Sequence, residues 1–344
     1  MRIGGRKVTI KDIARESGYS VSTVSRVLNN RRDVSLEAQK RISEIVAAHN
    51  FVPNNNAKHL KQSSSKNIAV LVKGTSNMLF ANIVEEVQRK LEQTRYSAEI
   101  SYIDEDKNEV EQALILCREW KPMGILFLGG NPSNFQEKFA GIEVPGVLIT
   151  NRGNMLEFEN LSSVAVDDVA AAKQAVDYLF SRGHEKIGVL GGDVNLSHTS
   201  LQRYQGCVKS FQEQGLTFNK EQYYENSRFS YESAYRAMVR LLKKAPDITA
   251  VFAMSDVTAI GAIRALKDKG LEVPRDISVI GFDGIDLADY YNPKLTTIKQ
   301  PAKELATRGV EILFNFIDFK SGSIHETVDV DLIPGESVKD LLRG

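Results

Sequence analysis

The spacing of hydrophobic positions changes near residue 67. Residues 8–50 have helical periodicity and no strand pattern, which predicts helices over 10–17, 21–28 and 36–49, the last with Ser35 as its N-cap. Further along, short apolar runs alternate with amphipathic stretches, as strands and helices do. The predicted strands are 67–72, 97–103, 124–129, 146–150, 163–167, 186–192, 250–256 and 277–283, and the predicted helices are 81–93, 110–120, 169–183, 231–244 and 256–270.

This alternation predicts an α/β body behind an all-α head. Strands that alternate with helices form parallel sheets covered on both faces. The alternating part has about 275 residues, too many for one compact sheet, so we expect two doubly wound lobes. Ligands of such sheets bind beyond the carboxyl ends of the strands. The polar, Ser-rich stretch 51–67 between head and body is typical of a linker.

Composition excludes several classes of protein. The chain is 42% hydrophobic and 26% charged, as globular proteins are. No apolar run approaches the ~18–20 residues of a membrane span, and the N-terminus lacks the apolar core of a secretory signal, so we expect a cytoplasmic protein without a membrane partner. The two cysteines, Cys117 and Cys207, are too few and too distant for a disulfide framework or a metal cluster.

Charge is unevenly distributed along the chain. Residues 1–62 hold 12 Lys or Arg against 5 Asp or Glu, a surplus of +7 that leaves −7 for the remaining residues of this neutral chain. A basic head on an acidic body predicts a polyanionic partner for the head alone. The alternative interpretation is a solvated basic face.

The head contains a helix-turn-helix pattern whose second helix suits the major groove of DNA. Ser20 is a predicted N-cap that leaves backbone N–H groups facing phosphate. Val21 offers a methyl surface to thymine, and Ser22 and Thr23 offer hydroxyls to bases or phosphates. Arg26 has the forked donors that pair with guanine. The alternative is a small helical subdomain whose hydroxyl residues only face solvent.

The chain resembles the LacI/GalR family of transcriptional repressors. The resemblance is carried by VTIKDIARESGYSVSTVSRVLNN and NFVPNNNAKHLK in the head, and by RGHEKIGVLGG, QRYQG, MSDVTAIGAIRAL, ISVIGFDG and LTTIKQP in the body. It implies a DNA-binding head (1–50), a hinge helix and linker (51–66), and a two-lobed body of periplasmic-binding-protein type (67–344). We expect about 67–165 and 299–320 in the N-lobe, and about 166–298 and 321–344 in the C-lobe.

The resemblance also implies partners and contacts. It implies a homodimer on near-palindromic double-stranded operator DNA, with 307–317 and the helix beginning near Asn82 at the dimer face. Residues 53–61 match the hinge helix, in which Leu60 would wedge into the minor groove or pack back on the body, and Ala57 would let two hinge helices approach. The implied DNA contacts are Thr9, Ser20, Val21, Ser22, Thr23, Ser25, Arg26, Asn29, Arg31, Asn54, Ala57, Lys58 and Leu60.

A small sugar-like effector is implied for the cleft between the lobes, so that the protein would regulate genes of carbohydrate uptake or catabolism. Arg203 would bond two hydroxyls or a carboxylate, and Asp283 would accept hydroxyls, unless the two form an ion pair that only holds the cleft together. Asp256 matches the family or caps the following helix. The implied effector contacts are Lys73, Phe80, Thr150, Arg203, Phe229, Ser255, Asp283 and Gln300.

Five of these positions carry open questions. Phe80 and Phe229 fall where relatives stack an aromatic on the sugar, although aromatic residues are often core. Thr150 stands where some relatives have Asp, and Ser255 where some have Asn. Lys73 adds a cation at the end of the strand 67–72. Losing a carboxylate and gaining an ammonium favours an anionic effector, such as a uronate or a sugar phosphate.

Catalysis finds no support in the motifs. The segment GVLGGD lacks the GK[ST] of a phosphate-binding loop, no GxSxG elbow occurs, and the five histidines have no metal spacing. We therefore expect no enzyme, no cofactor and no metal. An exported sugar-transport receptor is the alternative; it fits the body but not the basic head.

Overall fold

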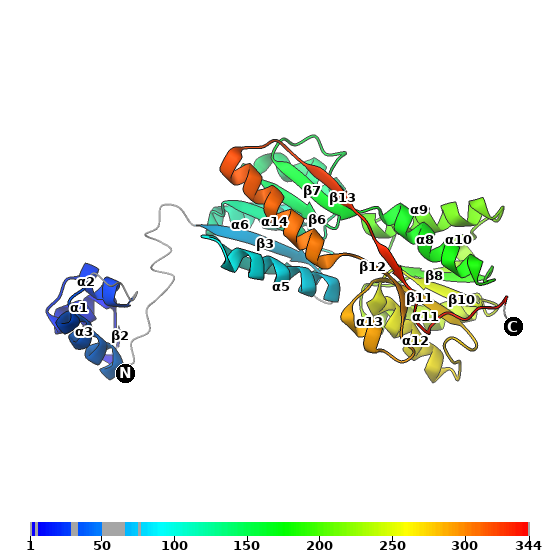
Figure 1. Ribbon diagram of the computed structural model, residues 1–344, viewed down its shortest axis with the longest axis horizontal. Helices are drawn as coiled ribbons and strands as arrows, with labels where there is room; N and C mark the ends of the chain where they lie inside the picture. Colours follow the sequence, from blue (N-terminus) through cyan, green and yellow to red (C-terminus); the bar gives the residue numbers. More distant parts are fainter. Residues whose placement is uncertain (1, 4–5, 29–33, 50–65, 75–76, 343–344) are drawn as a thin grey trace. The chain divides into compact units, whose positions relative to one another are not determined.

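The computed structural model describes residues 2–3, 6–28, 34–49, 66–74 and 77–342 (Figure 1). They divide into two units, a head within residues 1–65 and a body within residues 66–344. All eight predicted strands and all eight predicted helices of the sequence analysis are present, with ends shifted by up to three residues.

The head is a small bundle of α1 (Ile10–Ser17), α2 (Val21–Leu28) and α3 (Leu36–Ala48), preceded by the antiparallel strands β1 (Arg2–Ile3) and β2 (Arg6–Lys7). One apolar side chain from each helix, Ile13, Val24 and Ile42, is fully buried at its centre. Ser35 caps α3 as predicted, because its hydroxyl accepts the backbone N–H of Ala38 (3.3 Å).

The first lobe of the body is a six-stranded, fully parallel sheet in the order β13-β7-β6-β5-β3-β4. Its strands are β3 (Asn67–Lys73), β4 (Ser97–Ile103), β5 (Gly124–Leu128), β6 (Gly146–Ile149), β7 (Leu161–Val166) and β13 (His325–Val328). Alternate residues of the central strands face α5 (Met78–Glu92) and α14 (Ala302–Phe319) on one side, and α6 (Glu109–Trp120) and α7 (Pro132–Lys138) on the other.

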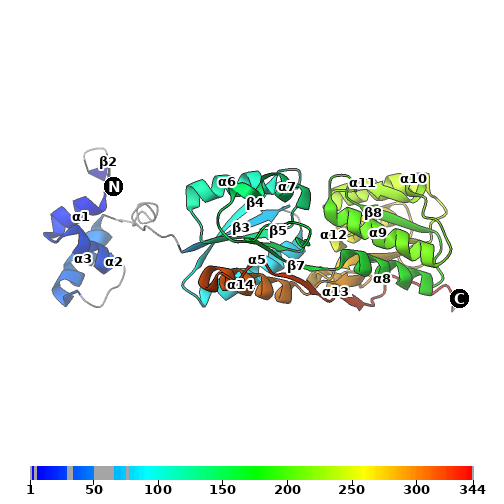
Figure 2. The same ribbon diagram turned by 90° about the horizontal axis from the view of Figure 1, so that it is seen from above.

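The second lobe repeats this architecture, with the order β14-β12-β11-β10-β8-β9 and only β14 antiparallel. Its strands are β8 (Ile187–Gly191), β9 (Tyr224–Asn226), β10 (Ala250–Ala253), β11 (Ser278–Asp283), β12 (Thr296–Lys299) and β14 (Asp331–Ile333). Helices α8 (Asp168–Ser181) and α9 (His198–Glu213) cover one face, and α11 (Tyr231–Lys244) and α12 (Asp256–Asp268) the other (Figure 2). The short α10 (Lys220–Tyr223) and α13 (Asp286–Tyr290) lie in loops.

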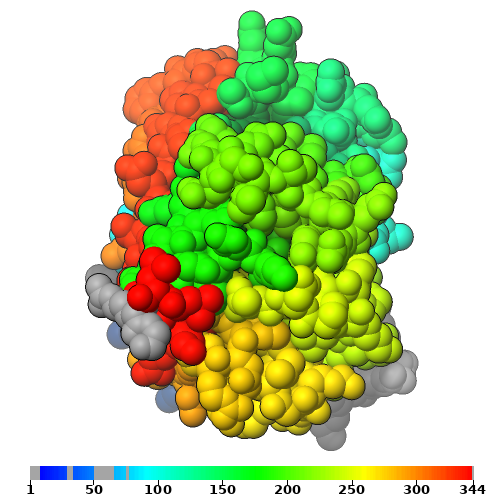
Figure 3. Space-filling model, turned by 90° about the vertical axis from the view of Figure 1, so that its right-hand side faces the viewer, coloured from blue at the N-terminus to red at the C-terminus, as the bar shows by residue number. Residues whose placement is uncertain are grey.

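The chain crosses between the lobes three times, after β7, after β12 and after β13. The expectation that 321–344 lies wholly in the second lobe is therefore wrong. His325–Val328 pairs with β7 and completes the edge of the first sheet before the chain returns as β14. The last described residues (red in Figure 3) lie on the second lobe, where His184 Nε2 bonds the Lys339 carbonyl (3.0 Å).

Candidate functional site

The recognition helix α2 has one buried and one exposed side. Ser20 is its N-cap, because the backbone N–H of Thr23 donates to Ser20 Oγ (3.1 Å). The side chains of Val21, Ser22 and Arg26 are exposed, and those of Thr23 and Ser25 are half-buried. Their accessibility is what base reading requires, and their contacts with DNA stay a prediction.

Thr9 has a structural partner of its own. Its backbone N–H and its hydroxyl both donate to Asp12 Oδ2, at 3.0 and 2.7 Å, which fixes the start of α1. Six other predicted DNA contacts lie outside the described residues, so their places stay predictions: Asn29, Arg31, Asn54, Ala57, Lys58 and Leu60.

Arg203 lies on α9 and is the centre of the body's buried polar cluster. Its Nε donates to Asp168 Oδ1 (2.8 Å), its Nη1 donates to the Met254 carbonyl, and its guanidinium carbon lies 3.6 Å from the centre of the Phe282 ring. Only 4% of Arg203 is exposed, so these partners fix the orientation of the guanidinium. The sequence analysis missed Asp168, although this residue directly follows a predicted strand, a position where a side chain that binds a ligand is expected.

Asp283 is also buried, but it is only a distant partner of Arg203. Its Oδ1 lies 3.8 Å from Arg203 Nη1 and accepts a hydrogen bond from Gln300 Nε2 (2.8 Å). Burial raises the pKa of Asp283 to about 6, against the lowering effect of the Arg203 guanidinium. The expected alternative, an ion pair of Arg203 with Asp283, is therefore weaker than the pair that Arg203 makes with Asp168.

Backbone strain marks one strand end in each lobe. Asp283 has φ = 111° and Thr150 has φ = 78°, values in the left-handed region that favours glycine. Both side chains are buried, at 2% and 7% exposed, and each ends or follows a central strand, β11 and β6. Such strain is concentrated at functional sites, where surrounding structure holds it.

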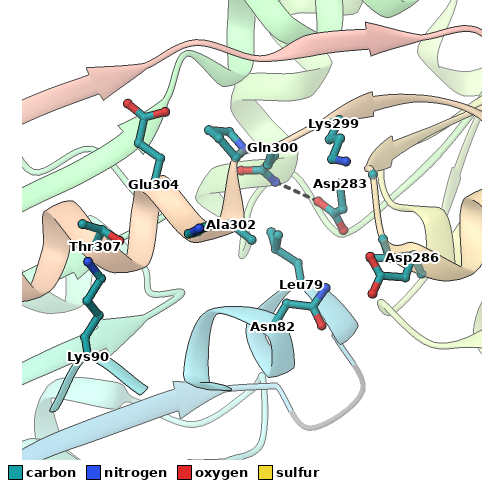
Figure 4. A pocket seen from close by; sticks show the side chains of 14 residues that line it. Leu79, Asn82, Lys90, Asp283, Asp286, Lys299, Gln300, Ala302, Glu304 and Thr307 are labelled. Carbon is teal, nitrogen blue, oxygen red and sulfur yellow. Dashed lines mark hydrogen bonds between the residues drawn. The ribbon is translucent and has the colours of Figure 1, made fainter. Parts of the chain in front are cut away.

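Asp283 and Gln300 line a pocket of about 620 Å³ at the crossing from β12 to α14 (Figure 4). Gln300 is 2% exposed, and its Oε1 is buried without a hydrogen-bond partner among the described residues. The other predicted effector residues do not line this pocket. Its charged lining consists of three lysines and three carboxylates, namely Lys90, Lys299, Lys303, Asp283, Asp286 and Glu304.

Lys73 was expected to supply an unbalanced cation, and the structure contradicts this. Its Nζ lies 2.6 Å from Oε2 of Glu109, the first residue of α6, whose side chain is 1% exposed. Glu109 Oε1 also accepts the backbone N–H of Asn131 (2.5 Å). The positive charge of Lys73 is thus compensated, and the basis for an anionic effector is lost. The pair escaped the sequence analysis because its members are 36 residues apart.

Three further candidates have structural roles in the described chain. Ser255 caps α12, because its Oγ accepts the backbone N–H of Thr258 (3.1 Å). Phe80 is buried within the hydrophobic core of the first lobe, as its alternative interpretation had it. Phe229 is half-buried and packs against the core of the second lobe.

Asp256 does not cap α12 through its carboxylate. Its Oδ2 accepts the Ile285 N–H (2.8 Å) and its Oδ1 accepts the Thr297 hydroxyl (2.6 Å), so it connects the loop after β11 to the beginning of β12. Burial raises its pKa well above the ordinary value for aspartate.

Loops at the carboxyl ends of the strands hold the two lobes together. Arg228, which follows β9, donates to Asp104 Oδ1 (2.8 Å) and to Glu105, both of which follow β4. Asn131 Nδ2 donates to the Leu196 carbonyl (3.0 Å). The strand ends of both lobes therefore face each other, as a cleft for a ligand requires.

Within the described residues, no group of three or more His, Cys, Asp or Glu side chains is placed to hold a metal ion. Nor does any helix of the described chain have the length and apolar character needed to cross a membrane.

The fold and these sites define a regulator with a helix-turn-helix head and a two-lobed, ligand-binding type of body. Residues 9–54 match the family described as bacterial regulatory proteins, lacI family, and residues 176–338 match the periplasmic binding protein-like domain. The HTH-type transcriptional regulator MalR of Clostridium butyricum is 39% identical over 96% of this chain and 99% of its own length. This chain belongs to the LacI family of transcriptional regulators, which confirms the resemblance seen in the sequence.

Solved structures agree with this fold. The lac repressor dimer bound to operator and the anti-inducer ONPF has a TM-score of 0.73 at 24% identity, covering 97% of this chain and 100% of that chain. The complex of the transcriptional regulator CelR with cellobiose has a TM-score of 0.70 at 24% identity, covering 96% and 99%. The predicted fold class, a helical head and two parallel-sheet lobes, is confirmed.

Proposed function

We propose that this protein is a homodimeric repressor of carbohydrate uptake or catabolism genes, whose affinity for its operator is set by a sugar bound between the two lobes. The observation that carries this proposal is the buried cluster of Arg203, Asp283 and Gln300. These side chains lie at the strand ends that face the other lobe, in a chain with a DNA-binding head.

The chemistry of the cluster suits a polyhydroxylated ligand. The Asp283 carboxylate and the unpartnered Oε1 of Gln300 accept hydrogen bonds, and the Arg203 guanidinium donates them. A buried acceptor without a partner costs free energy, which a ligand hydroxyl would recover. The binding of cellobiose by the structural neighbour CelR supports a sugar as the class of ligand.

The head supplies the other half of the proposal. The exposed residues of α2 would read base edges, and two heads related by a two-fold axis would need a near-palindromic operator. The dimer of the lac repressor supports a dimer for this chain. The interface would involve α14 and α5, as the family resemblance implies, and the hinge segment 53–61 would transmit closure of the lobes to the DNA.

The test is operator binding in the presence of sugars. The operator is first selected from random duplex DNA with the purified protein, and affinity is then measured by fluorescence anisotropy. We expect a near-palindromic site, a steep loss of affinity with salt, and a change of affinity on adding one sugar of a panel. In Asp283→Asn, the same change of operator affinity should need a higher sugar concentration, because the amide is a weaker acceptor than the carboxylate. A response that persists unchanged in this variant would contradict the placement of the effector, and failure to select any sequence would contradict the function.

A further inference from the structure

The first lobe contributes one charged pair to the cleft, Lys73 with Glu109. Lys73 ends β3, which lies between β4 and β5 in the sheet. The loops that follow β4 and β5 both contact the second lobe, at Arg228 and at Leu196. The carboxyl end of β3 therefore opens between two points of interlobe contact, toward the space that the proposed effector occupies.

Glu109 is held by several hydrogen bonds. Its Oε2 accepts from Lys73 Nζ (2.6 Å) and from Asn134 Nδ2 (3.0 Å), and its Oε1 accepts from the Asn131 backbone. Asn131 in turn donates to Leu196 of the second lobe. The Glu109 side chain is 1% exposed and is therefore shielded from water, and Lys73 is the charged group among these partners.

Lys73 keeps donors for a ligand without keeping a net charge. An ammonium group has three N–H donors, and Glu109 is the one partner of Lys73 among the residues that the structure describes. Two donors thus remain, on a side chain that is 14% exposed. They are suited to the oxygen atoms of sugar hydroxyls.

Three arginines near the strand ends of the two lobes also lie beside carboxylates. Arg203 is paired with Asp168, Arg152 lies 3.2 Å from Asp167, and Arg228 contacts three carboxylates. An anionic ligand bound beside Lys73 or these arginines would bury its charge against a cation that already has a carboxylate partner, which costs more than burying a neutral hydroxyl.

From this balance we infer that Glu109 determines the charge of the effector: it neutralises Lys73, so that the cleft selects an uncharged sugar and rejects its phosphorylated or carboxylated form. The inference rests on the proposed function. It reverses the preference for an anionic ligand that Lys73 alone indicated.

The experiment measures dissociation constants by calorimetry for matched pairs of sugars: glucose with glucose 6-phosphate, ribose with ribose 5-phosphate, and cellobiose with cellobiose 6-phosphate. The protein is used as the full chain, as wild type and as Glu109→Gln, Lys73→Gln and the double variant Lys73→Gln/Glu109→Gln. Thermal melting with circular dichroism verifies that each variant is folded.

We expect the wild type to bind one neutral sugar at least about tenfold more tightly than its phosphate. Glu109→Gln leaves Lys73 uncompensated and should move this ratio at least about tenfold toward the phosphate. The double variant removes both charges and should return the ratio to the neutral sugar. Lys73→Gln should weaken binding of the neutral sugar without tightening binding of the phosphate. This variant keeps the inference testable if Glu109→Gln does not fold.

Two results would overturn the inference alone: tighter binding of a phosphate by the wild type, or a folded Glu109→Gln with an unchanged ratio. If the wild type bound none of the six compounds, the sugar effector of the proposed function would fail, and the inference with it.

Discussion

Lowering the pH is expected to weaken effector binding through Asp283. Burial raises the pKa of this carboxyl group to about 6, and this exceeds the lowering caused by Arg203 and by the hydrogen bond from Gln300. The ionised carboxylate is the stronger acceptor of ligand hydroxyls, because hydrogen bonds to a charged acceptor are the stronger ones. The effector therefore binds the ionised form preferentially, and binding releases protons.

The size of the effect follows from the pKa. With a value of about 6, roughly nine-tenths of the molecules carry an ionised Asp283 at pH 7 and roughly one-tenth at pH 5. If only the ionised form binds, the dissociation constant rises about tenfold from pH 7 to pH 5, or ~1.4 kcal/mol. At pH 6, each binding event should release about half a proton.

Calorimetry at pH 7, 6 and 5 measures both the dissociation constant and the number of protons released. The proton release is obtained by comparing the binding heats in two buffers of different ionisation enthalpy. Asp283→Asn is the matched control, because its amide oxygen still accepts from Gln300 and it does not titrate. Burial also raises the pKa of Asp168, which is present in both the wild type and Asp283→Asn. Any dependence of effector affinity on pH that remains in Asp283→Asn therefore measures the contribution of Asp168. An equal slope in wild type and variant, or a constant affinity, would refute the reasoning.

Three further substitutions have defined outcomes. Arg26→Ala should cost roughly 1–3 kcal/mol of operator affinity and relax the preference at one base position; uniform weakening on all sequences would make Arg26 a phosphate contact instead. Arg228→Ala removes an interlobe ion pair and should lower the affinity for the effector about two- to fivefold at low salt and only slightly at 1 M salt. Arg236→Ala is the control: it breaks only an exposed ion pair within α11 and should leave the affinity for the effector unchanged. Gly206→Ala would overlap the Val169 carbonyl where α9 crosses α8, and should lower the unfolding free energy by about 1–3 kcal/mol in urea denaturation; an unchanged midpoint would contradict that close packing.

The fold was predictable where the pattern was long and periodic. The central strands are buried on both faces and are recognised as continuous apolar runs. The strands β9, β12, β13 and β14 were not predicted, because each has three or four residues and most of them lie at sheet edges. His325–Val328 even has an exposed, polar first half, so only its pairing with β7 makes it a strand.

The polar cluster was predictable in part for a related reason. Asp283 and Gln300 follow strands at the carboxyl edge, and parallel neighbours bring such residues together: β11 and β12 are hydrogen-bonded, and the Gln300 N–H donates to the Asp283 carbonyl (3.0 Å). Ser255 also follows a strand, β10, and Phe80 lies in α5, the helix after β3. Their side chains are used by a helix cap and by the core, and position alone does not decide this.

The charge of the cleft could not be predicted from the positions of residues relative to the predicted strands. The sequence shows that a side chain is positively charged, but it does not show which carboxylate lies beside it in the fold. The effect of the cation on a ligand depends on that carboxylate, which comes from another element. Lys73 meets Glu109 from 36 residues away, and Arg228 meets Asp104 from 124 residues away. Because a buried ion pair presents almost no net charge while each isolated member would present a full one, one unseen partner is enough to reverse the expected class of ligand. For this protein, the change from an anionic to a neutral effector therefore follows from one buried carboxylate, Glu109.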